Sequence, residues 1–141
     1  MPVPVPVTGF AHVRLTVTDI ERSRAFYDAV FGFQVAYELP AGADAATRQA
    51  LGFLYGGVIY TFGGGLLGLR PVAPGGDRFS EDRSGLDHLC FTVAGPADLE
   101  IAIAVLDGLG VEHGQVKNLG EVSILEFRDP DGIALELSAP N

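Results

Sequence analysis

The chain has 141 residues, a net charge of −9, and 48% hydrophobic against 19% charged residues, which predicts one folded domain over residues 1–141. The negative charge argues against nucleic acid and anionic membrane surfaces as partners, because phosphate binding needs clustered Lys and Arg. No apolar run approaches the ~20 residues of a membrane span. The single Cys90 excludes an intrachain disulfide and favours the cytoplasm.

The first predicted module spans about residues 8–72. Gly9 to Val17, GFAHVRLTV, alternates apolar and polar residues and indicates a half-buried strand. Thr18 and Glu21 fit a capping box for a helix ending near residue 31. The alternation then predicts strands over 33–39, 51–62 (interrupted by Gly56-Gly57) and 66–72, with a small-residue loop over 40–49 that has room for a helical turn.

A linker over residues 73–84, rich in Gly, Pro and charge, precedes the second module at 85–139. Within the linker, 77–79 forms either a flap over the site or an ordinary loop. The second module repeats the order of the first, with a helix opened by Gly95-Pro96. Its predicted strands cover 86–93, 115–119, 121–128 and 133–138, and the helix ends at 108–110. The fold class is therefore α+β, with two tandem βαβββ modules.

The two modules share a repeated pattern with a histidine at the same place. Gly85 to Val93, GLDHLCFTV, matches the first strand, so His12 and His88 are equivalent. Aligning GGLLGLRP with GIALELSAP places Gly68 opposite Glu136. If the modules pair about a pseudo-two-fold axis, the equivalent positions meet around a shared concave sheet.

His12, His88 and Glu136 are then candidate ligands for a metal. Two neutral imidazoles and one carboxylate suit a divalent transition metal and leave coordination positions open for substrate. The alternative is that each His is a hydrogen-bonded structural residue and that Glu136 is an ordinary strand carboxylate. The conjunction of two symmetric histidines with Glu136 favours the metal interpretation.

These features resemble the vicinal oxygen chelate superfamily, which includes glyoxalase I, extradiol dioxygenases, fosfomycin-resistance enzymes, methylmalonyl-coenzyme A epimerase and bleomycin-resistance proteins. The resemblance covers Thr8 to Ala139 and is carried by FAHVRLTV, ERSRAFYDAVFGF, LDHLCFTV and RDPDGIALEL. It implies metal ligation by His12, His88 and Glu136, and modules that pair into a curved, barrel-like mixed sheet with helices outside. It also implies a homodimer and one divalent ion, Fe²⁺, Mn²⁺, Ni²⁺ or Zn²⁺.

The resemblance does not single out one subfamily. Members similar to glyoxalase I and the epimerase have a further Glu or Gln ligand where this chain has Gly68. The three-ligand set is closer to that of extradiol dioxygenases and of fosfomycin-resistance transferases. The former also use further His residues and the latter a basic pocket, for which His113 and Lys117 are poorly placed in the sequence.

Strand phase adds second-rank candidates. Arg70 is predicted to orient an anionic substrate or enolate, and Glu126 to act as a general base. Each has a plain alternative as a surface residue of its strand. Two groups of residues are candidates for the pocket wall. Tyr60 and Phe62, with the nearby Tyr55, either line an aromatic pocket or simply pack in the core. Cys90 and Thr92 lie on the same strand face as His88.

Two functions remain open. The first is a metal-dependent enzyme, a dioxygenase or a lyase or isomerase, acting on a small molecule with adjacent oxygens. The second is a metal-free protein that binds or sequesters a small molecule, similar to the bleomycin-resistance group, for which the acidic balance would suit a cationic drug.

Overall fold

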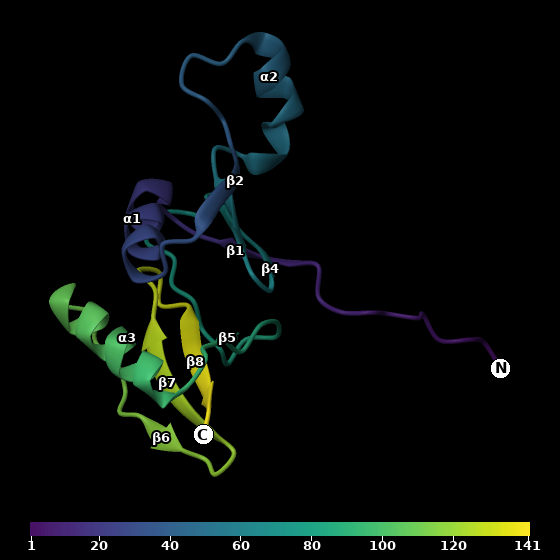
Figure 1. Cartoon of the computed structure of the whole chain (residues 1–141). Coiled ribbons are helices and arrows are strands. Elements are labelled where there is room, and N and C mark those ends of the chain that lie inside the picture. The colour runs from purple at the N-terminus through teal and green to yellow at the C-terminus, as the bar shows by residue number, and fades with distance from the viewer. The chain divides into compact units, whose positions relative to one another are not determined.

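The computed structural model describes residues 1–141 and contains two four-stranded mixed sheets, three α-helices and one short 3₁₀ helix (Figure 1). Contacts divide the chain into two compact units. Unit one comprises Met1–Ile20 and Phe33–Val72, and unit two comprises Glu21–Gly32 and Ala73–Asn141. No helix is both long enough and apolar enough to cross a membrane.

Unit one is built on a sheet with the strand order β1-β4-β3-β2. β1 is parallel to β4, and the other two pairs are antiparallel. The strands are β1 (His12–Thr16), β2 (Gln34–Glu38), β3 (Val58–Phe62) and β4 (Gly65–Arg70), with α2 (Ala45–Ala50) and the 3₁₀ helix η1 (Gly52–Leu54) between β2 and β3. The strand predicted over 51–62 is therefore wrong in its first half, because its interrupting glycines separate a helical turn from β3.

The first sheet has one buried face and one face that carries polar side chains. The buried face comprises Leu15, Val17, Val58, Tyr60, Leu67 and Leu69, each at most 3% exposed. His12, Arg14, Gly68 and Arg70 alternate with these residues and share the opposite face. This period of two is the pattern that the sequence shows in each strand.

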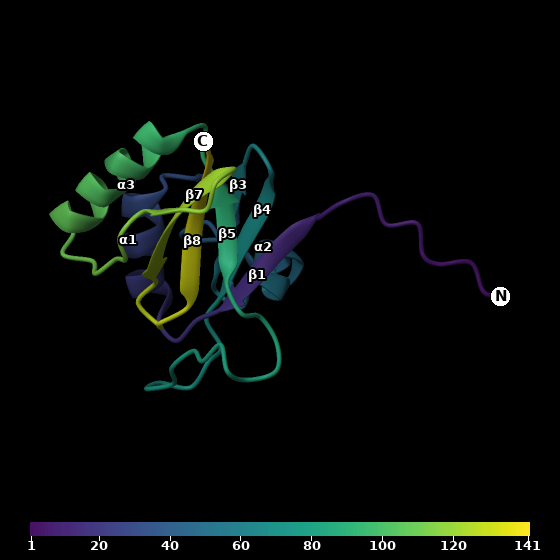
Figure 2. The same cartoon turned by 90° about the horizontal axis from the view of Figure 1, so that it is seen from below.

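Unit two contains the second sheet, of order β5-β8-β7-β6. Its strands are β5 (Leu89–Thr92), β6 (Lys117–Asn118), β7 (Val122–Arg128) and β8 (Ala134–Pro140), and helix α3 (Pro96–Gly108) packs on β7 and β8 (Figure 2). Pro96 starts α3 where its missing N–H costs nothing. The α+β class and the two βαβββ modules confirm the prediction, and neither sheet closes into a barrel.

Helix α1 (Ile20–Val30) comes from the first module in sequence but packs in unit two. The Phe31 ring lies 5.0 Å from the Phe91 ring and 6.1 Å from the Phe127 ring, centroid to centroid. Phe26 also contacts Phe127, at 6.4 Å. The aromatic residues of the predicted helix thus form part of the core beside β5 and β7.

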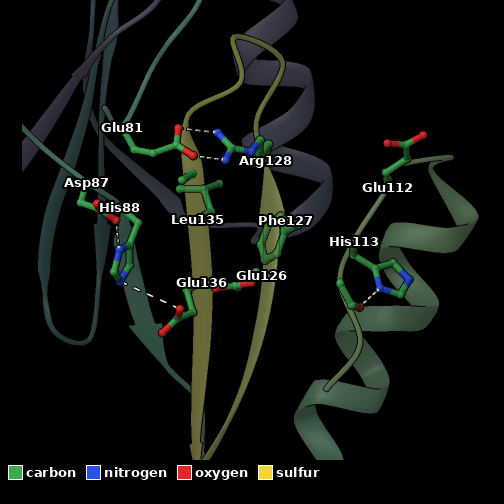
Figure 3. A pocket seen from close by; sticks show the side chains of 12 residues that line it. Glu81, Asp87, His88, Glu112, His113, Glu126, Phe127, Arg128, Leu135 and Glu136 are labelled. Carbon is green, nitrogen blue, oxygen red and sulfur yellow. Dashed lines mark hydrogen bonds and ion pairs between the residues drawn. The ribbon is translucent and has the colours of Figure 1, made fainter. Parts of the chain in front are cut away.

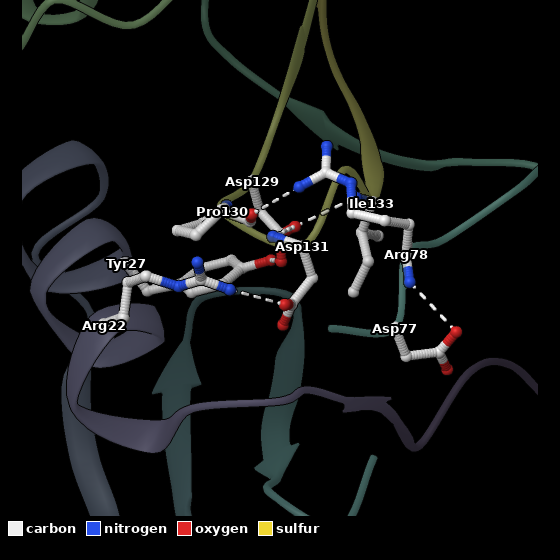
Figure 4. Close-up of polar contacts among 8 residues, drawn as sticks. All are labelled: Arg22, Tyr27, Asp77, Arg78, Asp129, Pro130, Asp131 and Ile133. Carbon is white, nitrogen blue, oxygen red and sulfur yellow. Dashed lines mark hydrogen bonds and ion pairs between the residues drawn. The ribbon is translucent and has the colours of Figure 1, made fainter. Parts of the chain in front are cut away.

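Within unit two, the turn between β7 and β8 binds helix α1 (Figure 4). Asp129 accepts hydrogen bonds from the Tyr27 hydroxyl and from the backbone N–H groups of Asp131 and Ile133, each at 2.9 Å. Asp131 pairs with Arg22 at 2.8 Å. The RDPDG motif is therefore a structural clamp between a helix and a hairpin.

The linker also holds this turn. The Arg78 side chain donates to the Pro130 carbonyl at 3.1 Å, and the Phe79 N–H donates to the Asp131 carbonyl at 3.0 Å. Gly132 has φ = +82°, and a β-carbon there would lie 2.9 Å from Nη2 of Arg78. Residues 78 and 79 thus serve as an anchored loop.

The two sheets confirm the internal alignment of the sequence. In the parallel ladder of β1 and β4, Arg14 is the partner of Gly68; in that of β5 and β8, Cys90 is the partner of Glu136. His12 and His88 each lie two residues before these partners. Gly68 and Glu136 are therefore equivalent positions in the two modules.

Candidate functional site

Each unit has a cavity that contains predicted metal ligands. The cavity of unit two, of about 540 Å³, contains His88 and Glu136 together with Glu126 (Figure 3). The cavity of unit one, of about 270 Å³, contains His12. The predicted triad is thus divided between the two units.

His88 lies immediately before β5, where its ring is held between two carboxylates (Figure 3). Its Nδ1 is 2.7 Å from Oδ1 of Asp87, and its Nε2 is 3.9 Å from Oε2 of Glu136. The hydrogen bond to Asp87 is the main reason why the pKa of His88 is raised, with smaller contributions from Glu136 and Glu126. Because Nδ1 donates to Asp87, the neutral imidazole keeps its lone pair on Nε2, the nitrogen on the side of Glu136.

Glu136 faces a second carboxylate across the hairpin. Glu126 on β7 is its direct partner in the antiparallel ladder with β8. Like charges directly opposite each other destabilise a sheet, so this pair calls for a cation nearby. Lys117 supplies one at 3.1 Å from Glu126, but its amine is exposed and bonds the outer carboxylate only. Glu126 lines the same cavity as His88 and Glu136.

The other candidates on β5 lie outside this cavity. Cys90 is the ladder partner of Glu136 and Thr92 that of Ser138, and neither side chain lines the cavity. Desolvation, reinforced by Glu136, raises the pKa of the Cys90 thiol to about 12. The thiol therefore stays protonated, which disfavours a role as a nucleophile.

Sequence reasoning did not identify Glu81 and Arg128 as lining residues of the cavity in unit two, and it named His113 only as poorly placed for a site. Arg128 binds Glu81 through two contacts of 2.5 and 3.1 Å, and this hydrogen bonding lowers the pKa of Glu81 to about 2. His113 pairs with Asp107 at 3.0 Å, and its Nδ1 lies 2.6 Å from the Gly114 carbonyl. Hydrogen bonds to the Gly114 carbonyl and then Asp107 raise the pKa of His113. Both its nitrogens are engaged, so His113 has a structural role.

The lining of the cavity of unit one is mostly apolar, and its basic residues are His12 and Arg14. The cavity is lined by His12, Val13, Arg14, Phe53, Ile59, Leu66 and Gly68. The Arg14 side chain crosses the face of the sheet, and its Nη2 donates to the Phe53 carbonyl at 2.5 Å. Arg70, on the same face, stacks on the Tyr55 ring, with its guanidinium carbon 4.3 Å from the ring centroid. Arg14 was not identified from the sequence, although its position two residues after His12 was a signal for it.

Tyr60 and Phe62, the predicted aromatic pocket wall, lie on the other side of β3. Tyr60 is 0% exposed, and the Phe62 ring stacks on Phe33 at 5.0 Å. Of the two roles that the sequence left open for them, packing is the one that the structure supports. The residues of β3 that face the cavity side are Ile59 and Thr61, because successive side chains alternate between the faces.

The donor set in unit two fits a metal ion in its chemistry. Imidazole and carboxylate ligands of one ion lie about 2.0–2.2 Å from it, which puts them about 3 to 3.5 Å apart. The 3.9 Å between His88 and Glu136 needs only a small side-chain rotation to reach that range. A carboxylate that holds the second nitrogen of a metal-binding His, as Asp87 does, is a common support for such ligands. No group of three or more His, Cys, Asp or Glu side chains is gathered closely enough in the structure to hold an ion.

Most of the chain matches the model of one family. The match to the Glyoxalase/Bleomycin resistance protein/Dioxygenase superfamily covers residues 9–137. The chain belongs to this superfamily.

Three proteins illustrate the breadth of this superfamily around the chain. The uncharacterised protein YaeR of Escherichia coli K12 is 30% identical over 128 residues, which cover 89% of this chain and 92% of YaeR. A glyoxylase/bleomycin resistance protein/dioxygenase domain from Frankia is 28% identical with a TM-score of 0.73, covering 96% of this chain and 93% of that one. A variant of the fosfomycin resistance protein FosX from Listeria monocytogenes, in complex with Mn(II) and 1S,2S-dihydroxypropylphosphonic acid, has a TM-score of 0.71 at 19% identity and covers 96% of this chain and 94% of that one. The last shows a shared fold alone.

Proposed function

We propose that this member of the superfamily is a divalent-metal-dependent enzyme acting on a small molecule with two adjacent oxygens. The observation that carries the proposal is the geometry of His88, with Nδ1 bonded to Asp87 and Nε2 3.9 Å from Glu136. The free nitrogen and the carboxylate line the same cavity. A bound ion would also offset the repulsion between the opposed carboxylates of Glu126 and Glu136, of which Lys117 pairs with Glu126 alone.

The proposed ligand set is His88, Glu136 and, from the sequence repeat, His12. Gly68 stands where a fourth ligand would be, so coordination positions of the ion remain for substrate oxygens. When bound, the ion would polarise these oxygens as a Lewis acid. Glu126 is then the candidate general base beside Glu136, and Arg70 the candidate group that orients a negatively charged part of the substrate.

The ion that we propose is Fe²⁺, Mn²⁺, Ni²⁺ or Zn²⁺. The Mn(II) complex of FosX, a protein of the same fold, supports a divalent ion in general. The three-ligand set favours an extradiol-dioxygenase-like reaction among the superfamily's activities. We also propose a homodimer, from the resemblance to the superfamily, and a cytoplasmic location, from the single free cysteine.

The test is metal content, measured by elemental analysis of protein purified without chelator and of apoprotein reconstituted with each ion. We expect one ion per chain in the wild type and a loss of at least tenfold in affinity for His88→Ala, Glu136→Ala and His12→Ala. The matched control is His113→Ala. His113 lines the same cavity, but both of its ring nitrogens already have partners.

Absence of a stoichiometric ion after reconstitution with all four metals would contradict the proposal. Equal loss of metal in His113→Ala would show that the cavity responds to any substitution rather than to its ligands. For the metal-loaded protein, O₂ uptake with a panel of catechols separates dioxygenase activity from lyase or isomerase activity.

The second candidate function is metal-free binding or sequestration of a cationic small molecule. The observation that favours it is the charge of the cavity in unit two, whose lining includes the carboxylates of Glu81, Asp87, Glu112, Glu126 and Glu136. Isothermal titration of chelator-treated protein with metal-free bleomycin tests it. Micromolar binding that is unchanged by His88→Ala supports this function over the metal-dependent one.

A further inference from the structure

The face of unit one that carries His12 also carries two arginines with no acidic partner. The guanidinium carbons of Arg14 and Arg70 lie 6.0 and 4.3 Å from the centroid of the Tyr55 ring. No carboxylate pairs with either, although the chain has 18 acidic and only nine basic residues. Other cations, Arg22, Lys117 and Arg128, each have a carboxylate partner. Two guanidinium groups close to one ring and without a carboxylate partner are available to an anionic ligand.

Tyr55, whose ring lies close to both arginines, has an unusual backbone conformation. Tyr55, with φ = +53°, is the only residue other than glycine with a positive φ. Such a conformation is costly for a residue with a bulky side chain and persists only where its surroundings enforce it. Two residues on, Gly57 approaches β4 so closely that a β-carbon would lie 1.9 Å from the Leu69 carbonyl oxygen. The loop is therefore fixed against β4, and Tyr55 is fixed with it.

Arg14 is positioned by the absence of a side chain opposite it. A β-carbon on Gly68 would lie 2.9 Å from Cγ of Arg14, so only glycine lets Arg14 run across the sheet to the Phe53 carbonyl. Its Nε is buried and has no hydrogen-bond partner. A guanidinium group has five N–H donors, so most of the donors of this pair remain available.

We propose that Arg14 and Arg70, both close to the Tyr55 ring, bind an oxyanion group of the protein's small-molecule ligand, a carboxylate or a phosphate-type group. Arginine is suited to such groups because its planar N–H donors bind two oxygens at once, and stacking on a ring leaves those edge donors free. The ligand would lie over the cavity that His12, Ile59 and Leu66 line. The inference rests on unit one alone and requires no metal.

The experiment is an NMR titration of chelator-treated, ¹⁵N-labelled protein with inorganic phosphate and, separately, with acetate, at constant ionic strength. The arginine Nε–H signals report each guanidinium directly. We expect saturable shifts at Arg14 and Arg70, and about a tenfold weaker affinity in Arg70→Gln. Tighter binding of phosphate identifies a tetrahedral anion, and tighter binding of acetate a carboxylate; both support the site.

Arg48→Gln is the matched control, because Arg48 lies on α2 of the same unit and bonds only the Ala43 carbonyl. The affinity of the Arg48→Gln variant for the anion should equal that of the wild type. Arg70 makes no hydrogen bond or ion pair with its side chain, so the only structural contact that Arg70→Gln removes is the stacking on Tyr55. Arg70→Lys tests the need for the planar group. Absence of saturation, equal shifts at Arg48, or unchanged affinity in Arg70→Gln would overturn the proposal, whatever the metal content of the protein.

Discussion

Arg14 occupies the space that a side chain at position 68 would need. The two residues are partners in the ladder of β1 and β4, and a β-carbon at Gly68 would lie 2.9 Å from Cγ of Arg14. Cγ is close to the backbone end of the arginine, so it has little freedom to move away. The position at which the second module has Glu136 is thus used in the first module to admit Arg14.

Substitution of Gly68 by alanine should therefore displace Arg14. We expect Gly68→Ala to lower the free energy of unfolding by about 1–2 kcal/mol, as overpacking commonly does, and to weaken binding of the anion. Urea denaturation measures the first effect and the NMR titration the second.

The control for this substitution is a double-mutant cycle. In the background of Arg14→Ala the clash is absent, and an alanine in a strand is favoured over glycine, so the same Gly68→Ala change should be neutral or stabilising. Additive effects of the two substitutions would contradict the steric explanation.

Asp87 should support metal binding through His88. Asp87→Asn weakens the acceptor for Nδ1 of His88 and so loosens the orientation and lowers the basicity of the ring. We expect a loss of about tenfold in metal affinity with no loss of fold stability, because losing such a support commonly costs 10–100-fold. A competition titration with a metal-binding dye measures it, and Asp107→Asn, which alters the partner of His113, should leave the affinity unchanged.

The Asp129 carboxylate should matter as a hydrogen-bond acceptor rather than as a charge. Burial, its largest influence, raises the pKa of Asp129, so the charge itself is disfavoured there. Asp129→Ala leaves the Tyr27 hydroxyl and two backbone N–H groups without an acceptor and should cost about 2–4 kcal/mol in unfolding free energy. Asp129→Asn keeps an acceptor oxygen, and we expect it to cost about 1 kcal/mol. Equal costs for the two variants would show that charge, not acceptance, is what counts.

The ion pair of Glu81 and Arg128 should make the free energy of unfolding depend on pH below about 4.5. The pKa of Glu81 falls from 4.5 to about 2 in the folded protein, so its contribution is present in full above 4.5 and is lost as the pH falls from 4.5 toward 2. The measurement is the difference in unfolding free energy between the wild type and Glu81→Gln across this range. That difference should vanish at the acidic end and shrink in high salt, since the pair is exposed. A difference independent of pH would contradict the assignment.

The placement of His88 and Glu136 in one cavity could be predicted from sequence, and the basic face of unit one could not. The alternation around His88 and the spacing of Glu136 from its turn glycine are local patterns, and they placed both side chains in one cavity. Tyr55 was grouped with Tyr60 on one expected strand. The structure instead separates them, because the glycines after Tyr55 end a 3₁₀ helix and turn its ring to the opposite side of the sheet from Tyr60.

The sequence by itself determined the two βαβββ modules and the equivalence of Gly68 with Glu136, because strand alternation, helix caps and turn glycines act over a few residues. Only the tertiary structure decided that α1 packs with the second sheet, that Tyr60 is core, and that Arg14 reaches across Gly68 to Phe53. The physical reason is that burial and steric room depend on which distant elements come to lie against a residue. The period of two in the sequence indicates which residues share a face of the sheet. The packing around the sheet decides whether that face is buried in the core or lines a cavity.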